Sequence, residues 1–336
     1  MHFSSANKNF DLYYFLILSI FIGFLPFVIK ANYHLLILNI MGLNVIVAIG
    51  LNLLIGYAGQ ISLGHAAFFG MGAYLSGIFT TNFDILARIP PWFSIWLLPW
   101  AIIFIAMLLT GAFAYSLGIP TLKLKGNYLV MATLGFNIII EIVLIDQDAI
   151  TGGANGLAGL PYLTLGGFLF DTDLKYYYLI WSLALLILIL SFNLINSRVG
   201  RALKAIHGSE VAANTLGINI QRYKVKVFAL SAMFASFAGS LYAHYITVIT
   251  PKSCDVGYSI HLVIMVIVGG LGNLWGPLFG AALVVFLSEF LHIAENFNTV
   301  SFGLILVLVM IFFPDGLMPG IVKMVRKRLA KSSYST

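Results

Sequence analysis

The sequence contains very little charge for its length. Only 9% of its 336 residues are Asp, Glu, Lys or Arg, whereas 60% are hydrophobic and the mean hydropathy is +0.99. So few charged residues could not cover the surface of a soluble domain of this size. Several apolar runs exceed the ~18 residues that cross about 30 Å of hydrocarbon. The chain is therefore expected to be an all-α polytopic membrane protein.

The sequence also lacks the motifs of several catalytic and metal-binding classes. Cys254 is the only cysteine, which excludes a disulfide framework and a cysteine-based metal site. His65 has no second metal ligand at a suitable spacing. Neither H-E-x-x-H nor the Walker A pattern G-x-x-x-x-G-K-[ST] occurs, which argues against an intramembrane enzyme and against ATP hydrolysis by that route. We expect no catalytic residue, metal or cofactor in this chain.

About ten membrane-spanning helices are predicted, in a single transmembrane domain that covers residues 1–336. The first apolar run has the length of a signal peptide, but it contains Pro26 and lacks a small-x-small cleavage site, so we interpret it as a retained span. The predicted spans are residues 12–30, 35–56, 61–80, 94–117, 127–146, 176–195, 225–249, 259–273, 276–291 and 299–314.

The distribution of basic residues favours one orientation. With ten spans, 14 of the 18 Lys and Arg residues fall on the side that holds both termini, the loop 197–226 and the tail 320–336. Acidic residues cluster on the other side. Since basic residues mark the cytoplasmic side, both termini are predicted to be cytoplasmic. The pI of about 9.3 then reflects membrane orientation and needs no nucleic-acid partner.

The longest polar interruption, Ser197–Lys226, contains a short predicted helix. Ser209 is a preferred N-cap, Glu210 lies where the helix dipole favours an anion, and Gly217 is placed as the C′ residue. Glu210, Ala213 and Gly217 are spaced to lie near one face. A small-residue helix exposed at the cytoplasmic surface indicates a docking site for a partner.

Two glycine-rich segments, 56–64 and 269–277, leave almost no loop between apolar runs. Each is either a tight hairpin or a break at membrane depth, where the backbone must be covered by protein or by a water-filled path. Their glycines and a following amide residue align in the same order, which suggests an internal repeat whose paired segments point toward a substrate path.

Several polar side chains fall inside or beside apolar runs, where such groups often line a pathway. The alternative is that they stabilise the breaks by hydrogen bonds to backbone, and that Glu141 is hydrated near the outer face. An ion-coupled secondary transporter would need a deep carboxylate, which only Glu141 offers. The path candidates are Asn44, Asn52, Gln60, Ser62, His65, Asn137 and Glu141.

The loop 147–175 is the largest on the predicted outer side. Its glycine-rich part contains too many glycines to form a membrane-spanning helix. It also contains too few charged residues to be a solvated linker. It is either an outer gate or docking surface for a binding protein, or a turn that holds two helices together. The candidate residues are Thr151, Gly152, Gly153, Asn155 and Gly156.

Five motifs in order resemble the permease subunits of bacterial branched-chain amino acid ABC importers, the LivM-like type. They are GYAGQISLGHAAFFGMGAY (56–74), TLKLKGNYLVMATLGF (121–136), TGGANGLAGLP (151–161), GRALKAIHGSEVAANTLGIN (200–219) and GGLGNLWGPLFGAAL (269–283). The resemblance implies that segment 200–219 is the cytoplasmic coupling loop that docks on an ATPase subunit. The coupling positions that the resemblance implies are Glu210, Ala212, Ala213 and Gly217, and Ser209 joins them as the N-cap. Arg201 and Lys204 either contribute to docking on the ATPase or only mark the cytoplasmic side.

The resemblance further implies a multi-subunit importer in the bacterial inner membrane. Its partners would be a second, LivH-like permease, two cytoplasmic ATPase subunits that use ATP and Mg²⁺, and a periplasmic substrate-binding protein. Leucine, isoleucine and valine are the first choice of substrate. Urea or short-chain amides are the alternative, because permeases for those compounds resemble this chain in the same motifs.

Overall fold

The computed structural model describes residues 8–28, 31–81, 98–124 and 126–292, together with the single positions 303, 307, 311, 316 and 320. Within these residues the chain is almost entirely helical, and its only strands are two antiparallel pairs of two-residue pieces. The predicted all-α class is therefore confirmed. The predicted span 299–314 and the predicted tail 320–336 lie outside the described residues, apart from the single positions.

Long helices account for most of the described chain. They are α1 (Lys8–Val28), α2 (Asn32–Asn52), α3 (His65–Thr81), α5 (Leu98–Thr121), α6 (Asn127–Asp146), α8 (Asp173–Asn196), α11 (Ile220–Ile246), α12 (Val256–Gly269) and α13 (Gly276–His292). Each of the first nine predicted spans overlaps one of them. Six segments in the described ranges are long and apolar enough to cross a membrane, and two further apolar helices, Phe15–Phe27 and Gly276–Phe290, are shorter. The chain is a polytopic membrane protein, although the count of ten spans is not confirmed.

Short elements connect these helices. They are η2 (Leu53–Tyr57, a π-helical turn), α7 (Asp148–Thr151), η4 (Gly153–Asn155), β1 (Leu157–Ala158), β2 (Thr164–Leu165), β3 (Phe168–Leu169), α9 (Arg198–Gly208), α10 (Glu210–Thr215), β4 (Val248–Ile249) and η5 (Pro251–Cys254). β1 pairs with β4, and β2 pairs with β3.

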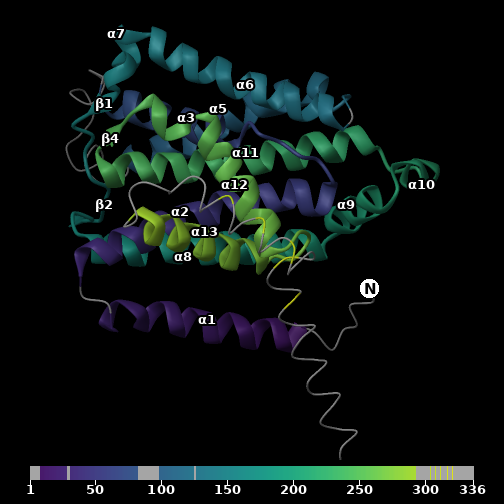
Figure 1. Cartoon of the computed structure of the whole chain (residues 1–336), viewed down its shortest axis with the longest axis horizontal. Helices are drawn as coiled ribbons and strands as arrows, with labels where there is room; N and C mark the ends of the chain where they lie inside the picture. The colour runs from purple at the N-terminus through teal and green to yellow at the C-terminus, as the bar shows by residue number, and fades with distance from the viewer. Residues whose placement is uncertain are drawn as a thin grey trace, which may run out of the picture.

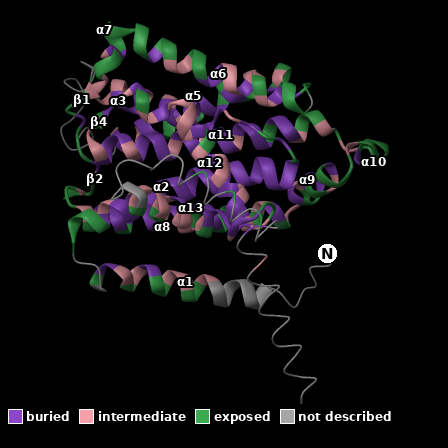
Figure 2. Ribbon diagram, in the orientation of Figure 1, coloured by how far each residue is buried: buried purple, intermediate pink, exposed green. Residues whose placement is uncertain are grey.

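Two helices form the centre of the bundle. In the segment formed by α2 and its π turn, 83% of the apolar 18-residue stretch that could cross a membrane is buried within the protein. In α11 the corresponding share is 72%. α2 packs against α8, α11, α12 and α13, while α11 packs against α3 and α5. α6, only 28% buried, lies at the edge, and α1 lies beside α8 apart from the other helices (Figures 1 and 2). The exposed apolar side chains of α1 and α6 are suited to contact lipid, because a surface facing hydrocarbon need not be polar.

Small residues bring α3 and α11 into backbone contact. A Cβ placed on Gly72 would lie 2.0 Å from the Ser236 carbonyl oxygen, and one on Gly239 would lie 1.9 Å from the Phe69 carbonyl oxygen. The Ser240 hydroxyl donates to the Gly72 carbonyl at 2.9 Å. Small residues and hydroxyl groups at such crossings are typical of helices that associate within a membrane.

The two loops that are predicted to lie on opposite sides of the membrane are at opposite ends of the molecule. α9 and α10 lie at one end, whereas α7, β1 and β4 lie at the other (Figure 1). This separation agrees with the sequence prediction that the loops 147–175 and 197–226 lie on opposite sides of the membrane. At the α7 end, the Lys175 ammonium donates to Asp171 at 2.6 Å and lowers the pKa of that exposed carboxyl.

Replacement of Gly72 by alanine is expected to lower the Tm of the detergent-solubilised protein by several degrees. The added Cβ meets backbone rather than a flexible side chain, so α3 and α11 must separate, and overpacking of this kind costs about 1–3 kcal/mol. Gly135→Ala on α6 is the matched control, because no heavy atom lies within 4 Å of the added Cβ. Equal Tm values for the two variants would contradict the close contact.

Candidate substrate path and coupling loop

The first glycine-rich segment is a hairpin. After its turn the chain re-enters the protein as irregular backbone before α3 begins. α2 ends in the π turn at Tyr57, whose ring centroid lies 5.9 Å from the Lys204 ammonium of α9. From this end the chain runs back without helical structure to His65, where α3 starts (Figure 1). The first N–H groups of α3 are therefore placed inside the bundle, where they need partners other than water.

Side chains of neighbouring helices supply those partners. The Ala67 N–H donates to Asn137 Oδ1 at 2.7 Å, and the Ala66 N–H donates to the Ser259 hydroxyl at 3.0 Å. The Leu63 N–H donates to Thr133 Oγ1 at 3.0 Å. α6 and α12 therefore cap a helix that begins within the protein.

The second glycine-rich segment is the turn between α12 and α13, and it lies against the first. Asn52 Nδ2 donates to the Asn273 carbonyl at 2.8 Å, and Asn52 Oδ1 accepts from the Gly272 N–H at 3.2 Å. A Cβ on Gly56 would lie 2.4 Å from the Gly272 nitrogen. Both segments are hairpins that the protein covers only in part, since Ile61 and Leu271 are exposed, and one amide side chain joins them.

Three other path candidates near the first hairpin are also buried and bonded within the chain. Gln60 Nε2 is 3.3 Å from the Gly59 carbonyl, the Ser62 hydroxyl accepts from the Gly64 N–H at 3.3 Å, and His65 Nε2 is 2.7 Å from the Ser231 hydroxyl of α11. None of these side chains lines either of the two cavities described next.

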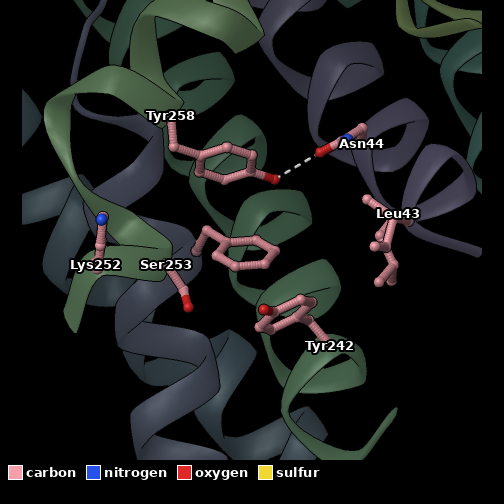
Figure 3. Close-up of a pocket in the computed structure, with 8 residues that line it drawn as sticks. Leu43, Asn44, Tyr242, Lys252, Ser253 and Tyr258 are labelled. Atoms are coloured by element: carbon pink, nitrogen blue, oxygen red, sulfur yellow. Dashed lines mark hydrogen bonds between the residues drawn. The ribbon is translucent and has the colours of Figure 1, made fainter. Parts of the chain in front are cut away.

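Asn44 is the path candidate that lies in a cavity. This first cavity has a volume of about 240 Å³, and residues of α2, α3, α11, η5 and α12 line it (Figure 3). Lys252 and Ser253 lie on the side opposite Leu43 and Asn44 (Figure 3). The Tyr258 hydroxyl donates to Asn44 Oδ1 at 2.7 Å. Ile40, Phe69 and Tyr242 complete the lining.

A second cavity of about 310 Å³ adjoins the first along α2, α12 and α13. Ile40, Asn44 and Tyr258 line both cavities, so the Asn44–Tyr258 hydrogen bond lies at their boundary. Tyr33 and Glu289 also line the second cavity, and the Tyr33 hydroxyl donates to the Glu289 carboxylate. Glu141 of α6 is half-buried and lines neither cavity.

The glycine-rich part of the loop 147–175 is a fixed turn at the α7 end. The Thr151 hydroxyl donates to the Leu144 carbonyl at 2.6 Å, and Gly152, Gly153 and Gly156 have φ values of +74°, +59° and +74°. A Cβ on Gly156 would lie 1.9 Å from the Ile249 carbonyl oxygen. The turn therefore fastens α6 to β4, while Asn155 remains exposed.

The short helix predicted in the loop 197–226 is present as α10, and its ends are formed as expected. The Ser209 hydroxyl accepts from the Ala212 N–H at 3.3 Å. The helix terminates at Gly217, which has φ +77° and open space around it. The Gly217 N–H donates to the Asn214 carbonyl at 2.9 Å, in the geometry of a glycine C-terminal cap.

The side chains of α10 divide between an inner and an outer face. Ala213 is buried against the rest of the chain. Glu210 accepts from Lys224 of α11 at 2.6 Å, where the Lys224 side chain is only 4% exposed. Val211 and Leu216 are each 77% exposed, and Ala212 and Thr215 also face outward. Glu210 and Ala213 thus hold α10 in place, and the outer face is more apolar than the predicted small-residue face.

Sequence reasoning missed the helix α9 that precedes α10. It begins at Ser197, whose hydroxyl accepts from the Val199 N–H at 3.1 Å, and it buries Ala202, Leu203 and Ile206. That apolar spacing of three and four residues is the signal that would have found it. Arg201 and Lys204 lie on its exposed side.

Sequence reasoning also missed Lys252, Ser253 and Tyr258 as cavity residues. The signal available was a Pro–Lys–Ser turn directly before an apolar run. It does not reveal that this turn lies beside Asn44, more than 200 residues earlier.

Comparison with known proteins places these features in a family. Residues 33–314 match a family described as "Branched-chain amino acid transport system / permease component". The high-affinity branched-chain amino acid permease protein LivM of Escherichia coli K12 is 33% identical over 243 residues, which cover 66% of this chain and 57% of that protein. A probable LivM of Methanocaldococcus jannaschii is 25% identical over 244 residues, covering 65% and 68%. The ribose import permease RbsC of Escherichia coli K12 is 28% identical over 120 residues, covering 34% and 37%.

No solved structure matches the chain significantly. The alignments with LivM of Escherichia coli and Salmonella typhimurium reach only 57% of the length of those proteins. The family match, in contrast, extends from the start of α2 to beyond α13 and includes both hairpins, both cavities and the loop that contains α9 and α10. The chain belongs to the family of branched-chain amino acid transport system permease components.

Proposed function

We propose that this chain is the membrane-embedded permease subunit of an ATP-driven importer for leucine, isoleucine and valine. The observation that carries the proposal is the family match over residues 33–314, which includes the protruding helix α10. The LivM relatives support the substrate class by their names. The cavities lie toward the end opposite α10, so substrate entry and ATPase contact are separated along the helices.

In this importer the chain forms a single permease domain with ten spans and both termini in the cytoplasm of a bacterium. It works in the inner membrane with a second, LivH-like permease, two ATPase subunits and a periplasmic binding protein. The ATPase subunits bind ATP and Mg²⁺, and this chain binds no cofactor and catalyses no reaction. The exposed turn around Asn155 is at the end that would meet the binding protein.

Deletion of the gene for this chain is expected to remove high-affinity uptake of radiolabelled leucine from the host cell and to leave urea and ribose uptake unchanged. Leucine uptake by the wild type should persist when an ionophore collapses the ion gradients while ATP is maintained. Loss of urea uptake instead would identify an amide importer. Loss of leucine uptake with the ionophore would identify an ion-coupled transporter and make Glu141 the residue to study.

Leu216→Asp is expected to reduce co-purification of an ATPase subunit with the tagged permease by at least about tenfold, the factor that corresponds to 1.4 kcal/mol. The exposed Leu216 would be desolvated in the contact, and an unpaired carboxylate there is costly. Leu165→Asp is the matched control, because Leu165 is also exposed but belongs to β2 at the opposite end. Equal recovery of the ATPase with both variants would rule out docking through α10.

Glu210→Gln is expected to impair transport more than the double variant Glu210→Gln, Lys224→Met. The single change leaves the ammonium of the buried Lys224 without its carboxylate, which typically costs about 3–5 kcal/mol, whereas removal of both charges is far milder. ATP-dependent leucine uptake and ATPase co-purification would be measured for both. If the two variants behave alike, Glu210 acts by contact with the ATPase and not by holding α10 on α11.

A further inference from the structure

The first cavity is lined by one charged side chain together with polar and apolar side chains. Lys252 supplies an ammonium group, and no ion pair is formed by Lys252 within the described part of the chain. Ser253, Tyr258 and Asn44 supply oxygen atoms, whereas Leu43 and Phe69 supply the apolar wall. A cavity of about 240 Å³ is smaller than the roughly 300–1,000 Å³ of most ligand pockets, so it suits a small metabolite.

This combination matches both ends of a zwitterionic amino acid. A carboxylate beside the Lys252 ammonium forms a charge-assisted hydrogen bond. An α-ammonium group needs only acceptors, and the hydroxyl oxygen of Tyr258 and the second lone pair of Asn44 Oδ1 provide them. A branched aliphatic side chain would then contact Leu43 and Phe69.

Neutral compounds fit this cavity poorly. Urea, an amide or a sugar gives the Lys252 ammonium no counter-charge, so it lacks the charge-assisted hydrogen bond that a carboxylate forms there. The cavity therefore discriminates by charge, independently of the selection made by a binding protein.

We propose that this cavity is a transient substrate site in which Lys252 binds the carboxylate, and the Asn44–Tyr258 pair the α-ammonium, of an amino acid with an apolar side chain. The inference rests on the proposed importer function. It identifies the site at which the transported amino acid first contacts this chain. Because Lys252 is exposed, binding there is weak and reversible. The Asn44–Tyr258 hydrogen bond lies where the lining of this site meets that of the second cavity, which extends toward the start of α2.

Thiol protection tests this site without requiring transport. Cys254, the only cysteine, is buried, so Ser253→Cys in a Cys254→Ala background places one accessible thiol in the cavity wall. The intact transporter complex is treated with a maleimide in the presence of leucine, acetamide or ribose, and labelling of this chain is read on a gel. Leucine is expected to slow labelling in a saturable manner, and acetamide and ribose are not.

Lys252→Met in the same background is expected to weaken protection by leucine about tenfold or more, as removal of a charged hydrogen-bond partner does. Lys252→Arg should retain it, and Lys175→Met, which changes a lysine at the same end but outside the cavity, should have no effect. Protection that persists in Lys252→Met, equal protection by acetamide or ribose, or no protection by leucine would each overturn the site. Leucine uptake without protection refutes this site alone, whereas protection in a complex that does not take up leucine refutes the proposed importer function alone.

Discussion

The structure depends on one requirement, that backbone groups placed within a membrane protein must have hydrogen-bond partners. Two of its helix connections, 58–64 and 270–275, bring irregular backbone into the bundle. Thr133 accepts from the Leu63 N–H of the first connection, and Asn52 bonds to the Gly272 N–H and the Asn273 carbonyl of the second. Asn137 and Ser259 accept from the first N–H groups of α3, directly after the first connection. In water these groups could be left to solvent, but in hydrocarbon each unsatisfied one costs several kcal/mol. Polar side chains in the spans of this protein are therefore committed first to its own backbone.

This requirement explains which parts of the structure the sequence predicts. Long apolar runs and local caps depend on neighbouring residues, so α6, the Ser209 cap and the Gly217 terminus are recognisable from short stretches. The partner of a buried polar residue depends on a distant segment. Asn137 caps a helix that begins 72 residues earlier, and Asn52 bonds to a turn 221 residues later. Neither pairing has a local signal.

The same distinction separates the path candidates. Gln60, His65 and Asn44 are all candidates because they are polar residues within apolar runs. Of these three, only Asn44 lines one of the two cavities described above. The residues that give this cavity its chemistry, Lys252 and Tyr258, belong to a turn and to a helix start that look unremarkable in sequence. A cavity is a property of how helices pack, and it appears only when α2, α3, α11 and α12 are assembled.

α11 connects the two functional ends of the molecule. Near its start Lys224 forms an ion pair with Glu210 of α10, and near its end Tyr242 lines the first cavity. These residues are 18 positions apart in one helix, or roughly 27 Å at the usual rise per residue. Between them, Gly239 and Ser240 fix α11 to α3 by backbone contact, so the helix cannot absorb a displacement by bending away from its neighbour. In the proposed importer, a movement of α10 imposed by the ATPase would therefore reach the wall of the substrate cavity through a single rigid element.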